Sequence, residues 1–175
     1  YNRWDYTGII HIYLRTLMLM NPDGTGQRAI YGTNSWFPNS LYFTRPLPGE
    51  TDRFVSILSG YHGPNRMGRL VLLDTTKGWS ETAGIVHEFP YRGRPLDVKI
   101  RDHLVQGTWP RFLHPWPLGD PKRPETCGRY FLVSCKMRPD SSWSIYLVDT
   151  FDNMVELYRE KGYALLEPVP LLQTS

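Results

Sequence analysis

The sequence predicts an all-β fold, and three observations point to it. Pro and Gly number 15 each, and aromatic residues make up 14% of the 175 residues, a mixture that suits short strands joined by tight turns. Helical periodicity is almost absent, whereas apolar runs of strand length recur, and each ends in Asp or Asn before a polar turn. Hydrophobic residues make up 41% of the chain, so the strands can enclose a core.

The predicted strands recur in a fixed order. An apolar strand that ends in Asn21, Asp74 or Asp149 is followed each time by a weaker strand, and twice it is preceded by a further apolar strand. These strands cover residues 15–21, 27–32, 53–59, 69–74, 84–91, 129–136, 144–149 and 154–158. Asp at the start of a turn accepts hydrogen bonds from nearby backbone amides, so we interpret Asp74 and Asp149 as turn residues rather than catalytic carboxylates.

A proline pattern marks one more strand, the first of the repeated set. It reads Thr-Arg-Pro-Leu-Pro at 44–48, His-Pro-Trp-Pro-Leu at 114–118 and Glu-Pro-Val-Pro-Leu at 167–171. Pro lacks a backbone donor and is therefore confined in sheets to strand starts, edges and bulges. Alternate prolines predict a first strand with one edge that has no hydrogen-bonding neighbour.

Four strands repeated in tandem predict a partial β-propeller with four-stranded antiparallel blades, of the TolB-like kind. The end of one blade is expected at 1–33, a second blade at 34–91, a loop plus a third blade at 92–160, and the first strand of the next blade at 161–175. A β-sandwich is the alternative, but it does not explain why the motifs recur together in the same order. Because propellers close with about 4–8 blades, we expect the protein to continue, or the chain to pair with itself or with another chain.

The residue before the first proline is polar in each copy, and Arg45, His114 and Glu167 hold this position. The first strand of a propeller blade lies beside the central channel, so the three side chains are predicted to converge on one axis. Such a cluster can bind a protein partner, an adjacent domain, an anion or a metal. The alternative is that these side chains solvate the channel or pair with one another.

A glycine-rich loop is a second candidate site. The segment Gly-Tyr-His-Gly-Pro-Asn-Arg-Met-Gly at 60–68 places His62 and Arg66 between two predicted strands, and loops on rigid scaffolds often carry binding residues. We expect a ligand or partner contact there, with a solvated hairpin as the alternative.

The chain has two cysteines, and their spacing matches no metal knuckle. Cys135 and His114 are candidate ligands of a metal site that other residues would complete, since zinc takes three or four ligands. The alternative for Cys135 is a buried strand residue. In an oxidising compartment, Cys135 can also pair with Cys127.

Charge and hydropathy exclude some classes of function. The net charge is +3 and no long run of like charges is present, so we expect no nucleic-acid partner. No apolar run is long enough for a spanning helix, so we expect no membrane insertion. The chain begins with Tyr, so we expect it to be part of a longer protein, and the lack of a visible signal peptide says nothing about location.

Seven segments, taken together and in order, resemble the haem-free middle region of the hydrazine synthase alpha-subunit family. They are MNPDGTGQ at 20–27, NSWFPNSLYFTRPLPG at 34–49, GYHGPNRMGRLVLLD at 60–74, WPRFLHPWPL at 109–118, YFLVSCK at 130–136, IYLVDTFDNM at 145–154 and GYALLEPVPL at 162–171. The resemblance covers nearly the whole chain. It implies an extracytoplasmic location, in the periplasm or an equivalent compartment.

The same resemblance implies a propeller region that scaffolds a haem domain or another protein partner, without catalysis or a cofactor of its own. The haem c groups of that family are attached through C-x-x-C-H motifs, and this chain contains none. One alternative is that the chain lines a haem or metal pocket of an oxidoreductase, completed by a C-terminal cytochrome c-type region. Another is a stand-alone propeller of the TolB type that binds a small ligand.

Overall fold

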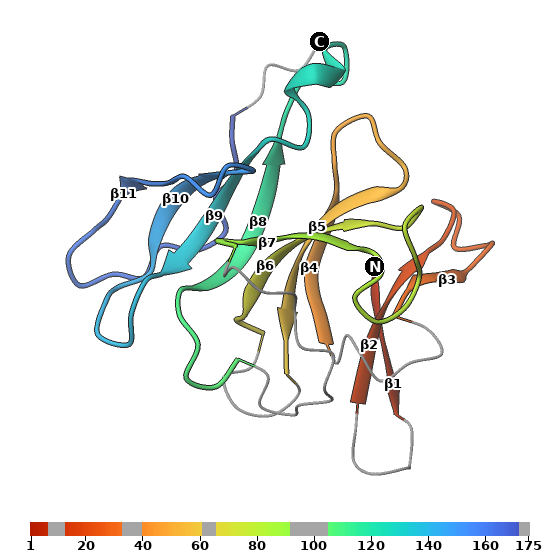
Figure 1. Cartoon of the computed structure of the whole chain (residues 1–175), viewed down its shortest axis with the longest axis horizontal. Coiled ribbons are helices and arrows are strands. Elements are labelled where there is room, and N and C mark those ends of the chain that lie inside the picture. Colours follow the sequence, from red (N-terminus) through yellow and green to blue (C-terminus); the bar gives the residue numbers. More distant parts are fainter. Residues whose placement is uncertain (7–12, 33–39, 61–65, 92–104, 172–175) are drawn as a thin grey trace.

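In the computed structural model the chain is all-β over the residues that the structure describes, namely 1–6, 13–32, 40–60, 66–91 and 105–171 (Figure 1). The strands are β1 (Asn2–Tyr6), β2 (Tyr13–Leu19), β3 (Arg28–Tyr31), β4 (Ser40–Pro46), β5 (Arg53–Ser59), β6 (Arg69–Asp74), β7 (Ile85–Phe89), β8 (Arg111–Leu118), β9 (Tyr130–Lys136), β10 (Ser144–Asp149) and β11 (Met154–Tyr158). One short 3-10 helix, Pro124–Thr126, lies between β8 and β9.

The strands form three consecutive antiparallel units, which we call the first unit (β1–β3), the second unit (β4–β7) and the third unit (β8–β11). In each unit the strands pair in chain order, and a single parallel bridge between Arg15 and Ser40 joins the first unit to the second. Figure 1 shows the first and third units on opposite sides of the second. No sheet closes on itself among the described strands.

The positions of β5 and β8 in their sheets explain two features of the sequence. β5 is a central strand with neighbours on both sides, and its apolar run is almost entirely buried. β8 is the edge strand of its sheet: its ladder is with β9, and on its other side only Phe112 is bridged, to Gly68, so Pro115 and Pro117 remove no ladder hydrogen bond there. The reason predicted for alternate prolines therefore fits β8, whereas β4 lies between β2 and β5 and residues 163–171 form no strand.

The turns after β6 in the second unit and β10 in the third are built in the same way. The Asp74 amide donates a hydrogen bond to Gly84 O at 2.8 Å, and the Asp149 amide donates one to Asn153 O at 3.1 Å. Each bond closes its turn. The Asp149 carboxylate also accepts hydrogen bonds from Asn153, which lower the pKa of Asp149 below its usual value. Asp74 accepts a hydrogen bond from Thr76 N at 3.0 Å. These contacts confirm the turn role predicted for both carboxylates.

A backbone contact that links successive units occurs twice. Gly68, directly before β6, exchanges two hydrogen bonds with Phe112 of β8, at 2.9 and 3.2 Å. Trp143, directly before β10, accepts a hydrogen bond from Leu165 N at 3.1 Å. Gly68 and Trp143 hold the same position in their units, and so do Phe112 and Leu165. Residues 163–171 therefore begin against the third unit as β8 begins against the second.

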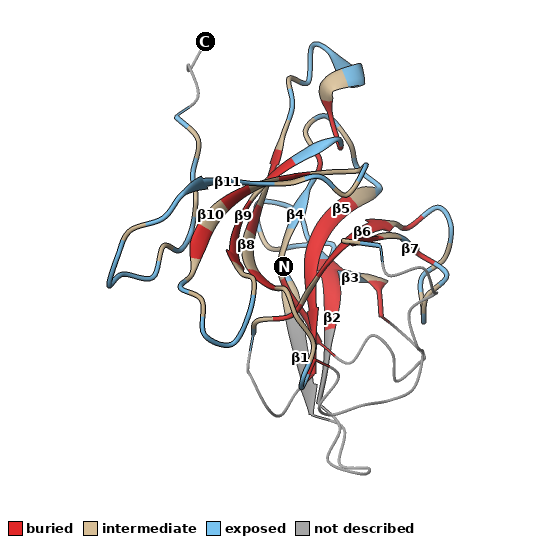
Figure 2. Ribbon diagram, turned by 60° about the vertical axis from the view of Figure 1, so that its left-hand side comes forward, coloured by how far each residue is buried: buried red, intermediate tan, exposed pale blue. Residues whose placement is uncertain are grey.

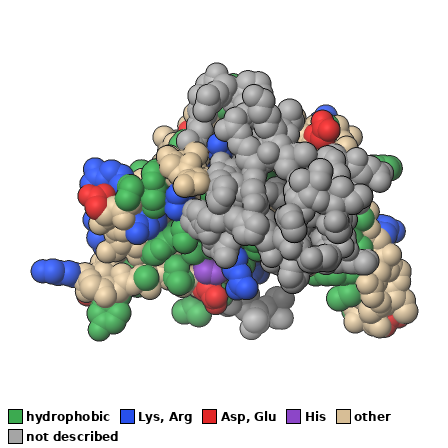
Figure 3. All heavy atoms as spheres, turned by 90° about the horizontal axis from the view of Figure 1, so that it is seen from below, with side chains coloured by type: hydrophobic (Ala, Val, Ile, Leu, Met, Phe, Trp, Pro, Cys, Tyr) green, Lys and Arg blue, Asp and Glu red, His purple; other side chains and the backbone are tan. Residues whose placement is uncertain are grey.

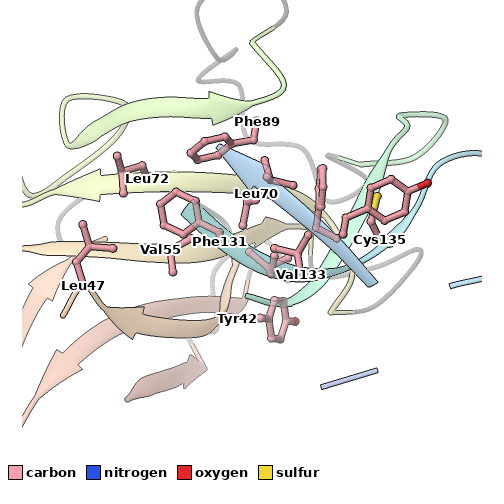
Figure 4. Packing of buried hydrophobic residues seen from close by; sticks show 13 residues of the cluster. Tyr42, Leu47, Val55, Leu70, Leu72, Phe89, Phe131, Val133 and Cys135 are labelled. Atoms are coloured by element: carbon pink, nitrogen blue, oxygen red, sulfur yellow. The ribbon is translucent and has the colours of Figure 1, made fainter. Parts of the chain in front are cut away.

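Two hydrophobic clusters lie between the units. One joins the second unit to the third and includes Val55, Leu70, Phe89, Phe131 and Val133, which Figure 4 shows packed together from both sheets. The other joins the first unit to the second, with Tyr31 among its fully buried members. Because burying one Phe or Leu is worth about 1.5–3 kcal/mol, these faces hold the units together.

The sequence prediction differs from the structure at the start of the chain and at the C-terminal segment, where residues 161–171, expected to begin the first strand of a further blade, form no strand. Residues 2–6 form β1, a strand that the sequence analysis did not predict. The strand predicted at 15–21 begins earlier, at Tyr13, and ends at Leu19. By contrast, the predicted bounds of β5, β6, β10 and β11 agree with the structure.

Candidate functional site

The two proline-marked strands and the C-terminal segment meet at an open pocket of about 390 Å³. We call it the axial pocket. Its lining comprises Phe43, Thr44, Arg45, Pro46, His114, Glu167, Pro168 and Val169. The structure thus brings Arg45, His114 and Glu167 to one place, although they lie far apart in the sequence.

A β-bulge in each first strand positions the side chains of this pocket. The register between β4 and β5 shifts after Tyr42, and the register between β8 and β9 shifts after Leu113. The residue that follows each shift has a left-handed backbone, with φ of 52° at Phe43 and 48° at His114. Glu167 has a φ of 55° and is the third such residue. Positive φ is uncommon outside Gly, so its recurrence marks one shared local geometry.

The bulge corrects the alignment made from the sequence. Phe43, not Arg45, is the structural equivalent of His114 and Glu167. In β8 and in the C-terminal segment a proline follows the bulged residue directly, whereas β4 has Thr44 there. The alignment from the sequence took the residue before the first proline in each copy and so matched Arg45 with His114. In the structure Phe43, two residues earlier, holds that position. Arg45 still lines the axial pocket, but from the position that Trp116 holds in β8.

His114 is the central side chain of the axial pocket. Its Nε2 lies 3.6 Å from Glu167 Oε1, and its ring meets Phe43 edge to face at a centroid distance of 4.3 Å. The His114 side chain is 16% exposed, while that of Glu167 is 76% exposed. Burial lowers the pKa of His114; the Glu167 carboxylate opposes this shift and Arg45 adds to it. The imidazole is therefore neutral at pH 7.

His114 Nδ1 is buried and has no hydrogen-bond partner among the described residues. A buried polar atom without a partner costs free energy, so it marks either strain or a partner that is supplied from elsewhere. Figure 3 shows a histidine side chain at the surface, next to acidic and basic side chains and among hydrophobic ones. This part of the surface carries acidic and basic side chains next to hydrophobic ones.

A second pocket, of about 450 Å³, adjoins the axial pocket. The Arg45 guanidinium lies 4.1 Å from the centre of the Trp116 ring, and Arg45 lines both pockets. Leu47, Leu118 and several prolines form the walls of the second pocket. This cation–π contact places the guanidinium over the indole ring and leaves N–H groups able to bind an anion.

The metal-ligand prediction for Cys135 finds no support in the structure. Its thiol lies fully buried in the core between the second and third units, 3.6 Å from Met137 Sδ. Burial raises the pKa of Cys135 to about 12, which keeps the thiol protonated. No group of three His, Cys, Asp or Glu side chains that could hold a metal occurs among the described residues. Cys127 and Cys135 are both free thiols.

The glycine-rich loop is only partly described. His62 lies outside the described residues. Arg66 is exposed and has a positive φ of 65°, and it does not line either pocket. The role predicted for this loop stays a prediction.

The sequence analysis missed one contact between units. His87 Nε2 of β7 lies 2.8 Å from Asp152 Oδ1, in the turn that joins β10 to β11. Tyr91 N donates to the same carboxylate at 3.1 Å. The two residues lie in different repeats, so no local sequence pattern could have paired them. The contact ties the second unit to the third.

Comparisons of the chain with protein-family models, with curated proteins and with solved structures found no match. Over the described part of the chain, no helix has the length and apolar character needed to cross a membrane.

Proposed function

We propose that this chain is a partial β-propeller that serves as a partner-binding scaffold, as part of a hydrazine synthase alpha-like extracytoplasmic protein. The observation that carries the proposal is the backbone link from Gly68 of the second unit to Phe112 of the third, which recurs from Trp143 of the third unit to Leu165 of the C-terminal segment. A link that recurs from one sheet to the next supports the proposal, because propeller blades repeat about a common axis. On this proposal the first strands are innermost, with the axial pocket between them.

The chemistry of the axial pocket favours binding over catalysis. It combines a neutral imidazole, an exposed carboxylate and a guanidinium stacked on Trp116. The pocket is open and has apolar walls, so an acidic side chain of a partner could reach Arg45 while its apolar part packs beside the prolines. Arg and Trp are the residue types that most often dominate binding energy at protein interfaces.

One observation favours the redox alternative as a second candidate. His114 is neutral, and its buried Nδ1 has no partner among the described residues, so the ring could serve as a haem or metal ligand. A neutral imidazole fits such a group, whereas Cys135 is buried in the core and does not line the axial pocket. The remaining ligands would have to come from another region of the protein.

Two titrations of the isotope-labelled chain separate these candidates. A scaffold for a haem domain predicts that adding a small c-type cytochrome shifts the amide signals of Arg45, His114 and Glu167, and that Arg45→Ala abolishes the shifts. A haem pocket predicts instead that hemin binds, with a Soret band that moves away from that of free hemin and a shift that His114→Ala removes. Cytochrome-induced shifts confined to residues far from the axial pocket, or no shift at all, would contradict the scaffold proposal.

A further inference from the structure

The second pocket is a candidate site distinct from the axial pocket. It measures about 450 Å³ and is lined by the ends of β4 and β8 and by the turns that follow them. This volume falls in the range of roughly 300–1,000 Å³ that small-molecule sites occupy. Its lining comes from two stretches, 45–50 and 116–121, so the second and third units form it without the C-terminal segment.

Arg45 is the cation of this pocket, and it makes no ion pair with any described residue. Its guanidinium lies 4.1 Å from the centre of the Trp116 ring. Trp116 holds in β8 the place that Arg45 holds in β4, so the contact joins equivalent positions of two units. The contact restricts a long side chain in advance, which lowers the entropy cost of pairing the guanidinium with an anion.

The acid of the pocket, Glu50, is already paired. Its carboxylate accepts a hydrogen bond from Arg53 Nη1 at 3.1 Å. The Arg53 guanidinium packs on Gly128, where a Cβ atom would lie 3.4 Å from both of its terminal nitrogens. Because this ion pair offsets the charge of Glu50, the pocket keeps the positive charge of Arg45.

The walls of the second pocket are apolar and already formed. Apart from Trp116 they comprise Leu47, Leu118 and four prolines, namely Pro46, Pro48, Pro117 and Pro121. Hydrogen bonds close the turn after β4, from Leu47 N to Arg53 O at 3.0 Å and from Glu50 N to Leu47 O at 3.1 Å. Each proline fixes its own φ, so an apolar group that enters the pocket meets a surface that needs no further ordering.

The charge of the pocket indicates which anion fits it. The fork of a guanidinium matches the two oxygens of one carboxylate. A phosphate dianion carries more charge than one guanidinium offsets, and Arg45 is the only Lys, Arg or His in the described lining. One cation among apolar walls therefore favours a carboxylate that is attached to an apolar group.

We propose that the second pocket binds an organic acid, with the carboxylate on Arg45 and the apolar part against Leu118 and the prolines. The acid is either a free small molecule or an acidic side chain of another protein. This inference goes beyond the proposed function and does not depend on it, because the second and third units alone form the pocket.

The first test is a titration of the isotope-labelled chain with hexanoate, followed by NMR at the Trp116 indole N–H. We expect a saturable shift, and we expect the neutral amide of the same size, hexanamide, to bind at least about tenfold more weakly. Arg45→Gln should weaken hexanoate binding by at least about tenfold for the same reason. Arg66→Gln is the matched control, since Arg66 is exposed and lines neither pocket, and it should leave hexanoate binding unchanged.

A second set of variants places the acid in one pocket or the other. Pro121 lines the second pocket only, and it belongs to the loop after β8, which is largely exposed (Figure 2). Pro121→Glu should weaken hexanoate binding by at least about fivefold through repulsion between like charges, whereas the neutral Pro121→Gln should keep it. His114→Gln changes the axial pocket only and should also keep it.

Three results overturn the inference. They are the absence of a saturable shift, hexanamide that binds as tightly as hexanoate, and an Arg45→Gln variant that binds hexanoate as the parent chain does. A fourth is a loss of binding in His114→Gln with none in Pro121→Glu, because the acid would then lie in the axial pocket.

A blocked tripeptide with Glu between two Leu residues separates the two sources of the acid. Tighter binding of the tripeptide than of hexanoate indicates an acidic side chain of another protein, and tighter binding of hexanoate indicates a free acid. Both results support a carboxylate site in the second pocket.

The cytochrome titration described above keeps this inference apart from the proposed function. If hexanoate does not bind while the cytochrome shifts the signals of the axial pocket, only the carboxylate site is refuted. If hexanoate binds and the cytochrome has no effect, the scaffold proposal is refuted and the carboxylate site stands.

Discussion

The second and third units are built on the same plan but differ in their surroundings. β7 and β11 both end in an aromatic residue, Phe89 and Tyr158, which pairs with an apolar residue of the preceding strand. The third unit covers Phe89, while Tyr158 is exposed. Equal sequence patterns therefore produce unequal burial, because burial in a repeat depends on the next repeat.

The largest expected effect is the difference in unfolding free energy between variants at these two positions. Phe89→Ala should lower the free energy of unfolding by about 3–5 kcal/mol, since it leaves a cavity in the core between the units. Tyr158→Ala, at the equivalent exposed position, should change it by less than about 1 kcal/mol. Urea unfolding measures both. Equal losses would contradict the difference in burial between the two positions.

A second comparison concerns the residue that links successive units. A Cβ atom at Gly68 would lie 2.1 Å from Leu58 O, so Gly68→Ala should cost about 1–3 kcal/mol by forcing the backbone apart. Trp143 holds the same position in the third unit and already carries a large side chain, so Trp143→Ala should not strain the backbone. The measurement is again urea unfolding. A Gly68→Ala variant as stable as the parent chain would contradict the close approach of β5 and β6.

The axial pocket gives a smaller effect that depends on pH. Because folding lowers the pKa of His114, the unfolded chain binds more protons between the folded pKa and about 6.5, and stability falls as the pH drops through that window. His114→Gln should remove this part of the pH dependence. Unfolding free energies at pH 7.5 and pH 5.5 for both chains measure it. If the His114→Gln variant loses as much unfolding free energy between pH 7.5 and pH 5.5 as the parent chain, other groups cause the effect.

The smallest expected effect is on the pKa of His114 itself. Glu167→Gln removes the group that raises it and should lower the pKa further, whereas Arg45→Gln removes a group that lowers it and should raise the pKa. NMR titration of the imidazole protons follows both variants. Shifts of the same sign in the two variants would contradict the charge arrangement of the axial pocket.

The sequence predicted the units well and the site only in part. Strand bounds such as 69–74 and 144–149 could be predicted because an apolar run and an Asp turn are local signals. The bulge at Phe43 could not, since it depends on how β4 pairs with β5 and no proline marks it. His114 and Glu167 were aligned correctly because a proline follows each directly.

The burial of Cys135 confirms the alternative that its apolar strand offered, a buried strand residue. The pairing of His87 with Asp152 was beyond prediction, because it depends on how one unit packs against another and strand patterns do not specify that. The short strand β1 was missed because its polar residues, Asn2 and Arg3, hide the alternation expected of a strand. Packing between units thus determines contacts that the local sequence does not specify.

Hydrogen exchange at Leu165 tests the central claim most directly. The claim is that residues 163–171 dock on the third unit as β8 docks on the second, through the hydrogen bond from Leu165 N to Trp143 O. We expect the amides of Leu165 and Phe112 both to exchange slowly, while the amide of Leu166 exchanges fast. A Leu165 amide that exchanges as fast as that of Leu166 would contradict the account.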